Sequence, residues 1–442
     1  MRYKSIFFIM ILSALISGCI KKEITVQTPY DLEILEQKPY LYIHEDITIP
    51  QEEKVRLYSD FLVKFFKPWD IEQISYDIEI AKWAFEYTQK TVYGENHLLI
   101  TKEWFDNIIE YANFEDFNTQ AKKAITINNS HLRALPTQSV IFYNPQKAGE
   151  GFPFDYNQNS SIKPNIPLFI SHFSKDGLWA FVESNFALGW ISLKDIAFVD
   201  DDFISEFRNN NYFVNTKDNT LIYSNNYLVD NLKIGTILPQ HNDKFVYVSK
   251  DYAHNAFIVY IDKNDNFRQF PLDFNRENIK LLSSQLIGQK YGWGGLYGHR
   301  DCSSMIRDFY MPFGIFLQRN SSDQKKDGIV HEIGHLSNQD KKDFIVQNGI
   351  PFLTIVYLRG HTMIYIGHVD KEPLVFHNVW GIRTLESDGS IGRYIVGRAV
   401  VSTLELGKDL PESKKDALLI DRVESITLIA EEASVTKLIT NR

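Results

Sequence analysis

The spacing of apolar residues changes character twice along the chain. Between positions 51 and 127, apolar residues recur at steps of three and four, a period that predicts amphipathic helices. The clearest runs are Val55, Tyr58, Phe61, Leu62 and Phe65, followed by Trp104, Phe105, Ile108, Ile109 and Ala112. We therefore expect a helical N-terminal module over 51–130, whose simplest role is to pack against the rest of the protein.

From residue 132 to 274, the apolar residues fall in short runs of high β-propensity that turn residues separate. The first set is Val140–Tyr143, Pro167–Ser171, Leu178–Val182 and Leu188–Leu193, and the second is Thr220–Tyr223, Gly235–Leu238, Lys244–Ser249 and Ala256–Ile261. Two such sets predict two small β-barrels, over 131–203 and 204–275. The step Gly189-Trp190-Ile191 resembles the signature of bacterial SH3-like domains.

The last region, 276–430, mixes both periods. Helices are predicted over Asn278–Gln289 and Cys302–Met311, and strands over Phe352–Leu358, His361–Gly367 and Pro373–Val379. This mixture predicts an α+β domain. The expected fold class is therefore multidomain α+β, in which a helical module and two barrels precede the last domain.

The first 19 residues have the features of a secretory signal. Two basic residues precede an apolar stretch from Ile6 to Ile16, and the run Ile16-Ser17-Gly18-Cys19 resembles a bacterial lipoprotein cleavage box. The stretch is shorter than the roughly 20 apolar residues of a membrane span. We expect a signal peptide over 1–19, a mature protein that begins at a lipidated Cys19, and a tether over 20–50.

A lipidated Cys19 would attach the protein to the extracytoplasmic face of a bacterial envelope membrane. Ile20 stands where an aspartate would signal retention in the inner membrane of enteric bacteria. We therefore prefer the outer membrane, facing the periplasm, as the location.

Size and charge limit the classes of partner. The chain has 442 residues, of which 44% are hydrophobic, more than a single core usually accommodates. Its formal net charge is −9, and the loss of Arg2 and Lys4 with the signal makes the mature protein more negative. This charge argues against nucleic acid as a partner and suits a substrate that carries amines. We expect a monomer without a metal or an organic cofactor.

The sequence contains two cysteines, so lipidation of Cys19 would leave Cys302 as the one free thiol. A glycine-rich stretch from Tyr291 to Gly298 leads to Cys302 at the start of a predicted helix, with Asp301 as its N-cap. The positive end of a helix dipole lowers the pKa of a thiol and favours the thiolate. The pattern therefore favours a nucleophile over a buried structural cysteine.

A thiolate nucleophile needs a general base, and the base needs an orienting partner. His361 begins one predicted strand, and His377 lies in the next. A turn centred on Val369 would set the two histidines directly opposite each other, with side chains about 5 Å apart. One histidine could then pair with Cys302 while the other holds its tautomer.

Several segments of the last region match one known family. They are Tyr291-Gly292-Trp293-Gly294-Gly295, Arg300-Asp301-Cys302-Ser303-Ser304, Phe313-Gly314-Ile315, Arg319-Asn320-Ser321-Ser322, Gly360-His361, Met363–Gly367 and His377-Asn378-Val379-Trp380-Gly381. This part of the chain resembles the NlpC and p-sixty family of cell-wall cysteine peptidases, which have a papain-like fold, and the whole arrangement is similar to the lipoprotein subgroup with two SH3-like domains. The resemblance implies that Cys302 is the nucleophile, His361 the base and His377 the third polar residue.

The resemblance also implies a substrate, the peptidoglycan stem peptide. Cleavage would fall between γ-D-glutamate and a diamino acid, commonly meso-diaminopimelate, in fragments with a free N-terminal L-alanine. Asp301 would then pair with the substrate ammonium, unless it serves only as an N-cap. The further substrate-contacting candidates are Tyr291, Ser303, Ser321 and, from the first barrel, Glu183.

Two alternatives have to be weighed. The run His331-Glu332-Ile333-Gly334-His335 satisfies the H-E-x-x-H pattern of zinc peptidases. That pattern needs a helix to place both imidazoles on one face, and its glycines and the following Ser337-Asn338 disfavour a helix, so we expect a loop at the edge of the cleft. The second alternative is a non-catalytic lipoprotein that binds the cell wall through its SH3-like domains.

Overall fold

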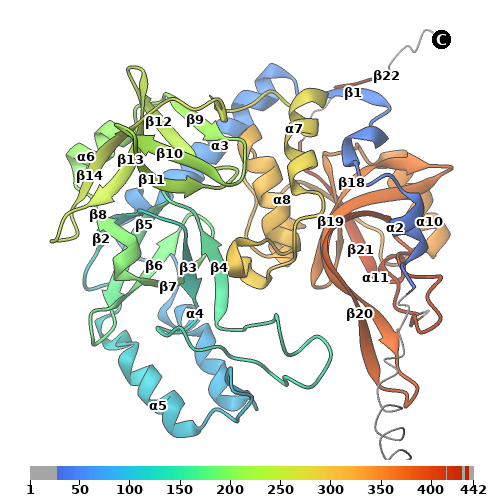
Figure 1. Ribbon diagram of the computed structural model, residues 1–442, viewed down its shortest axis with the longest axis horizontal. Helices are drawn as coiled ribbons and strands as arrows, with labels where there is room; N and C mark the ends of the chain where they lie inside the picture. The colour runs from blue at the N-terminus through green and yellow to red at the C-terminus, as the bar shows by residue number, and fades with distance from the viewer. Residues whose placement is uncertain (1–26, 415, 431–433, 438–442) are drawn as a thin grey trace, which may run out of the picture.

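The computed structural model describes residues 27–414, 416–430 and 434–437. Two lobes lie on either side of a central pair of helices (Figure 1). One lobe holds two small barrels, and the other holds a C-terminal sheet. No helix in the described part of the chain is long and apolar enough to cross a membrane. The predicted signal peptide and Cys19 lie outside the described residues.

The first barrel is a seven-stranded antiparallel sheet with the order β4-β3-β7-β6-β5-β2-β8. Its strands are β2 (Lys122–Thr126), β3 (Ser130–Arg133), β4 (Gln158–Ile162), β5 (Pro167–Phe173), β6 (Trp179–Ser184), β7 (Leu188–Ser192) and β8 (Ile196–Phe198). Leu168, Val182 and Ile191 are fully buried inside it. The sheet begins before residue 131, the predicted boundary, because β2 joins it between β5 and β8.

The second barrel combines a five-stranded sheet, β14-β13-β12-β9-β15, with the hairpin β10-β11. Its strands are β9 (Tyr212–Asn215), β10 (Thr220–Ser224), β11 (Tyr227–Leu232), β12 (Ile237–His241), β13 (Lys244–Lys250), β14 (Ala256–Ile261) and β15 (Phe267–Gln269). Asn225 and Asn226 both have positive φ, which suits the two-residue turn of the hairpin. Helix α6 (Asp201–Phe207) connects the two barrels.

The C-terminal domain is built on a six-stranded antiparallel sheet with the order β16-β21-β17-β18-β19-β20. The strands are β16 (Ile329–Glu332), β17 (Thr354–Leu358), β18 (His361–Val369), β19 (Glu372–Leu385), β20 (Ile391–Thr403) and β21 (Val423–Leu428). The helices are α7 (Arg276–Leu286), α8 (Cys302–Tyr310), α9 (Ser321–Gln324), α10 (Asn338–Asn348) and α11 (Leu419–Arg422). Ile306 and Phe309 of α8 pack on one face of the sheet, and Ile345 of α10 packs on the other. This is the α+β fold that the sequence predicts.

The described part of the segment expected to be a tether, residues 27–50, is instead folded onto the C-terminal domain. It contains α2 (Tyr30–Ile34), the 3₁₀ turn η1 (Pro39–Tyr42) and β1 (Glu45–Thr48). The Gln37 amide exchanges two hydrogen bonds with the backbone of Val401, at 2.9 and 3.0 Å. Apolar side chains between 42 and 47 are buried, and such burial explains why this segment packs on the domain.

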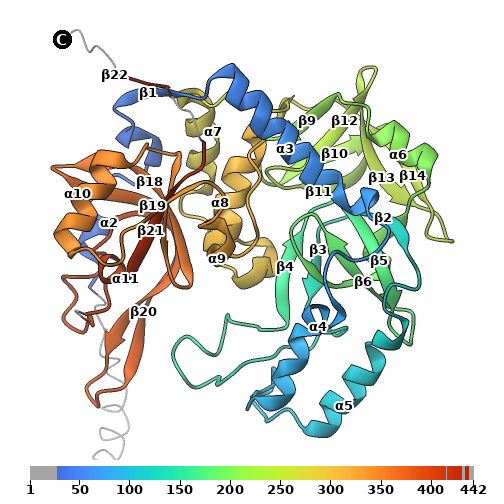
Figure 2. The same cartoon turned by 180° about the vertical axis from the view of Figure 1, so that it is seen from behind.

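The N-terminal helices pack against the rest of the protein. Helix α3 (Gln51–Asp70) runs diagonally behind the molecule (Figure 2). The Phe61 ring lies 5.2 Å from Phe270 and 6.3 Å from Phe316, and Trp69 lies 5.5 Å from Phe207. The remaining elements, α4 (Ile78–Ala81), η2 (Trp83–Gln89) and α5 (Lys102–Tyr111), pack on the first barrel. The first predicted helical run thus forms α3, which contacts both lobes, and the second forms α5, which packs on the first barrel.

Candidate active site

Cys302, the first residue of α8, lies in a cleft between the lobes. Two pockets of about 290 and 300 Å³ meet there. They share a wall made of Tyr291, Trp293, Cys302 and Gly360. We call the pocket of about 290 Å³ the barrel-side pocket, because residues of the first barrel and the start of α8 complete it. We call the pocket of about 300 Å³ the hairpin-side pocket, because His361 and the β19-β20 hairpin complete it.

The glycine-rich stretch lets the first barrel approach Cys302 closely. Gly295 has a φ of +84°, and a Cβ atom there would lie 2.0 Å from Ser161 Oγ on β4. Only glycine fits this close approach. Asp301 then caps α8, because its Oδ1 accepts the Ser304 N–H at 2.8 Å while Ser304 Oγ accepts the Asp301 N–H at 2.9 Å. These contacts fix Cys302 at the first turn of the helix.

The two histidines form a directed hydrogen-bond chain. His361 Nε2 lies 2.8 Å from His377 Nδ1, and His377 Nε2 lies 3.0 Å from Ser402 Oγ. Ser402 donates its own proton to the Thr403 carbonyl at 2.8 Å, so its oxygen accepts from His377 Nε2–H. His377 Nδ1 therefore accepts from His361 Nε2–H. This order leaves the lone pair on His361 Nδ1, as a general base requires.

The predicted register of these histidines is wrong by two residues. The β18-β19 pairing sets Ile364 opposite Phe376, and a two-residue turn at Asp370 and Lys371 joins the strands. Both turn residues have positive φ, which matches the twist of a tight hairpin. Continuing this register places His361 and His377 diagonally on the same face. Long side chains reach across a diagonal pair, so the contact forms without direct opposition.

The protonation of the resting site differs from the expectation based on the helix dipole. Burial raises the pKa of the Cys302 thiol, and the neighbouring Asp301 carboxylate raises it further, although backbone N–H groups oppose both. Burial, aided by the charge of Arg422, lowers the pKa of His361 to about 4. The effect of burial therefore exceeds that of the helix dipole. At neutral pH the sulfur carries the proton, and His361 is neutral and able to accept it.

The barrel-side pocket brings together four of the predicted substrate-contacting residues. They are Tyr291, Asp301, Ser303 and Ser321. Asp301 Oδ2 also accepts from Arg319 Nη2 at 2.7 Å and from the Gly294 N–H at 3.0 Å. Burial would raise the pKa of Asp301, but Arg319 holds it below its ordinary value. Asp301 is thus the N-cap, and it keeps its negative charge at the pocket wall.

The structure does not bring Glu183 to this cleft. Its buried carboxylate accepts from Lys67 Nζ at 2.8 Å and from the Ser75 N–H at 2.7 Å. Neither pocket at Cys302 is lined by it. Glu183 therefore joins the N-terminal segment to the first barrel, since β6 directs the side chain away from the cleft.

The H-E-x-x-H run is not helical: its first two residues belong to a strand, and the other three form part of the loop that we expected. His331 and Glu332 belong to β16, an edge strand that pairs with β21, and His335 lies in the turn after it. Strand neighbours point to opposite faces. The zinc-peptidase pattern therefore lacks the helix that would set both imidazoles on one side.

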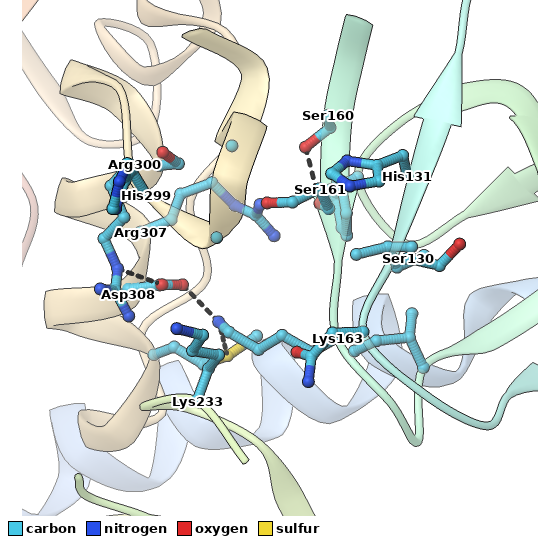
Figure 3. Close-up of a pocket in the computed structure, with 18 residues that line it drawn as sticks. Ser130, His131, Ser160, Ser161, Lys163, Lys233, His299, Arg300, Arg307 and Asp308 are labelled. Atoms are coloured by element: carbon cyan, nitrogen blue, oxygen red, sulfur yellow. Dashed lines mark hydrogen bonds and ion pairs between the residues drawn. The ribbon is translucent and has the colours of Figure 1, made fainter. Parts of the chain in front are cut away.

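A third cavity, of about 140 Å³, lies behind α8, between this helix and strands β3 and β4 (Figure 3). Asp308 of α8 accepts from Lys163 of the first barrel and, at 2.6 Å, from Arg300 Nε. Arg300 also donates to Asp218 of the second barrel at 2.6 and 2.8 Å. Cys302 does not line this cavity. The buried ion network instead connects both barrels to the helix that carries Cys302.

Two residues of the site were missed from the sequence. A carboxylate buried at the start of α8 needs a cation nearby, and Arg319, inside a matched motif, was available as that partner. Ser402 carries no local signal. It reaches His377 only because β19 and β20 pair with His377 opposite Val400, which puts Ser402 on the diagonal.

Sequence comparisons identify three parts of the chain. Residues 288–387 match the NlpC/P60 family, and residues 7–117 match the N-terminal stabilising domain of NLPC_P60 proteins. Residues 141–192 match an SH3 domain of the SH3b1 type. No curated protein matches the chain significantly.

A solved structure shares this fold. An NlpC/P60 endopeptidase from Photobacterium damselae subsp. piscicida superposes with a TM-score of 0.83 at 25% identity, and the match covers 92% of this chain and 98% of that one. An NlpC/P60 family protein from Bacillus cereus gives a TM-score of 0.38 at 17% identity, over 61% of this chain and 81% of that one. The chain thus contains an NlpC/P60 cysteine-peptidase domain, preceded by an NLPC_P60 stabilising domain and an SH3 domain, and has the fold of an NlpC/P60 endopeptidase.

Proposed function

We propose that this protein hydrolyses peptidoglycan stem peptides at the bond between γ-D-glutamate and the diamino acid, commonly meso-diaminopimelate. The observation that carries the proposal is the placement of Cys302, at the start of α8, in the same pocket as His361, whose tautomer His377 and Ser402 fix. A nucleophile, an oriented base and a cleft on both sides of the sulfur are the parts that acyl transfer needs.

The reaction uses an acyl-enzyme. Cys302 Sγ attacks the γ-carbonyl carbon of D-glutamate while its proton passes to His361 Nδ1. The oxyanion forms next to the N-terminus of α8, where the first N–H groups of a helix have no partner within the helix. His361 then gives the proton to the leaving amine, and the C–N bond breaks. Water, activated by the same histidine, hydrolyses the thioester and restores the thiol.

The barrel-side pocket supports a preference for short fragments with a free N-terminal L-alanine. Its walls include Tyr87, Tyr156 and Gln158, which the N-terminal segment and the first barrel add to a cleft opened by α8. Asp301 is the only carboxylate among the described residues that line it. Arg319 lines the same pocket and pairs with Asp301, which it keeps ionised, so the carboxylate remains an acceptor. A small, walled pocket with such an acceptor suits a terminal ammonium rather than a capped or extended chain.

Hydrolysis of two matched peptides tests this function. We expect protein that starts at Lys21 to release L-Ala-γ-D-Glu from L-Ala-γ-D-Glu-meso-diaminopimelate, and to cleave the N-acetylated peptide at least about 10-fold more slowly, since an acetyl group removes the charge that Asp301 faces. A zinc chelator should have no effect. Equal rates on both peptides would refute the ammonium contact, and no cleavage of either would favour the wall-binding alternative.

Replacing Ser402 with alanine tests the hydrogen-bond chain. Loss of the acceptor lets His377 carry its proton on Nδ1, which forces His361 into the tautomer that cannot accept a proton from sulfur. We expect kcat to fall on the order of 10-fold or more, with little change in KM, and the pH profile of kcat to shift.

Ser425→Ala is the matched control for this substitution. Ser425 is buried in β21 of the same sheet, and its hydroxyl has no hydrogen-bond partner among the described residues. We expect this variant to keep full activity. If both variants retain the same kcat and pH profile, Ser402 does not set the histidine tautomer.

We further propose that a lipid on Cys19 attaches the protein to the extracytoplasmic side of the envelope, in the outer membrane. The lipobox-like run Ile16-Ser17-Gly18-Cys19 supports this proposal. Mass spectrometry of the mature N-terminus tests it, and an unmodified Cys19 would refute it.

A further inference from the structure

Four arginines surround the hairpin-side pocket. They are Arg359, Arg383, Arg393 and Arg422. No aspartate or glutamate is among the described residues that line this pocket. Arg393 donates to the Gly392 carbonyl at 2.9 Å, and Arg422 donates to the Arg359 carbonyl at 3.0 Å, so neither hydrogen bond neutralises the charge. In the described part of the chain, no carboxylate forms an ion pair with any of the four.

Two of these arginines repel each other across a hairpin. The β19-β20 register places Arg383 directly opposite Arg393. Like charges in this position destabilise a strand pair. Burial lowers the pKa of Arg393, and the charges of Arg383 and Arg422 lower it further. Glu424 lies outside the pocket lining and offsets only part of the charge on Arg422. This arrangement does not serve the stability of the fold, so an anion from outside is its natural partner.

The pocket with the arginines is the one that receives the leaving group. His361 lines this pocket and not the barrel-side one, whereas Asp301 lines only the barrel-side one. The general acid must lie within hydrogen-bond reach of the leaving nitrogen. The product that departs with that nitrogen therefore lies among the four arginines.

We propose that Arg359, Arg383, Arg393 and Arg422 bind the free carboxylates of the leaving diamino acid and select a dicarboxylic diamino acid, such as meso-diaminopimelate, over lysine or an amidated diaminopimelate. The proposal rests on the function proposed above. Guanidinium groups bind carboxylates in a bidentate geometry, and several of them together can hold two carboxylates.

The charge at the far end of the leaving side chain decides the selectivity. In meso-diaminopimelate this end carries a carboxylate beside its ammonium, so its net charge is zero and the carboxylate can face an arginine. In lysine, or after amidation of that carboxylate, only the ammonium remains. A bare ammonium among four guanidinium groups meets repulsion and finds no carboxylate.

Three tripeptides that differ only in the third residue test the inference. They are L-Ala-γ-D-Glu followed by meso-diaminopimelate, by its side-chain amide, or by L-lysine. We expect kcat/KM for the first to exceed that for the other two by about 10-fold or more. In the double variant Arg383→Gln and Arg393→Gln, the first peptide should lose most of this advantage, while the lysine peptide changes little.

Arg398→Gln is the matched control, because Arg398 is an exposed arginine of the same strand outside the pocket lining. We expect it to leave the preference unchanged. Binding of the three peptides to the Cys302→Ala protein, measured by calorimetry, tests selectivity without hydrolysis. Equal affinities of the Cys302→Ala protein for the three peptides would overturn the inference. An equal loss of kcat/KM for all three peptides in the double variant would also overturn it. Selective binding without cleavage by the wild-type protein would instead contradict only the proposed hydrolysis.

Discussion

Replacing Cys302 with alanine is expected to lower kcat for stem-peptide hydrolysis by at least about 10⁴-fold, because removing the nucleophile leaves only binding and oxyanion stabilisation. Cys302 is the only free cysteine in the described part of the chain. No other thiol there can take over the attack. The measurement is release of L-Ala-γ-D-Glu from the free-amine tripeptide by wild type and variant under identical conditions.

The control for Cys302→Ala is a check that the variant still folds and still binds the tripeptide. Cys302 is buried, so alanine leaves a small void but removes no ion pair. The variant should keep a cooperative thermal unfolding transition and its affinity for the tripeptide. Residual hydrolysis that a chelator abolishes would transfer the chemistry to His331 and His335. Residual hydrolysis that is insensitive to chelator would show that Cys302 is not the nucleophile.

Local patterns were sufficient to predict the elements that carry the chemistry. The helix that starts at Cys302 has an N-cap and a clear end, and the strands that carry His361 and His377 are long apolar runs. Each of these signals lies within about ten neighbouring residues, where capping and side-chain periodicity act. The family motifs lie in the same segments, which is why the catalytic domain was the most predictable part.

Elements that depend on distant partners could not be predicted in the same way. No strand is predicted after Val379, yet β21 forms between β16 and β17. The segment over 20–50 contains prolines typical of a linker, yet Tyr42, Ile43 and Ile47 are buried against the rest of the protein. In both cases tertiary burial decides the structure, and the local sequence does not record its partner.

The predicted positions and roles of side chains were wrong where they depend on strand register or on a partner that is distant in sequence. The turn at Asp370 and Lys371, together with the bulge between Tyr365 and Gly367, moved the histidine pairing by two residues. Glu183 was assigned to the substrate because of its charge, but Lys67, from a distant helix, neutralises it. The arginines at 383 and 393 gave no signal as separate residues. Their meaning comes from the hairpin that sets them opposite each other.

Replacing Asp308 with asparagine is expected to lower the free energy of unfolding by about 3–5 kcal/mol, because it leaves two buried cations without their shared carboxylate. Lys163 and Arg300 both donate to Asp308, and Arg300 is 4% exposed. The measurement is urea or thermal unfolding. Asp106→Asn is the matched control, since it removes an exposed ion pair with Lys102, which is worth about 0–1 kcal/mol.

The pH dependence of the difference in unfolding free energy between wild type and Asp308→Asn identifies its cause. Burial alone would raise the pKa of Asp308, but the charges of Lys163 and Arg300 outweigh burial and hold it below its ordinary value. A group whose pKa is lowered by folding stabilises the protein above its unfolded pKa of about 4, and the contribution is lost as pH falls through the folded pKa. The difference in unfolding free energy between wild type and Asp308→Asn should therefore be constant near neutral pH and shrink below about pH 4.

The same substitution connects stability to specificity. Lys163 belongs to the first barrel and Asp308 to α8, so their ion pair fixes the barrel that walls the barrel-side pocket against the helix that carries Cys302. When this contact weakens, the pocket opens more easily. The rate of cleavage of the N-acetylated peptide should then rise relative to that of the free-amine peptide. If Asp308→Asn is less stable but prefers the free-amine peptide as strongly as wild type does, the buried ion network has no role in substrate choice. A change in unfolding free energy no larger than that of Asp106→Asn would show that the buried carboxylate is not needed to hold the lobes together.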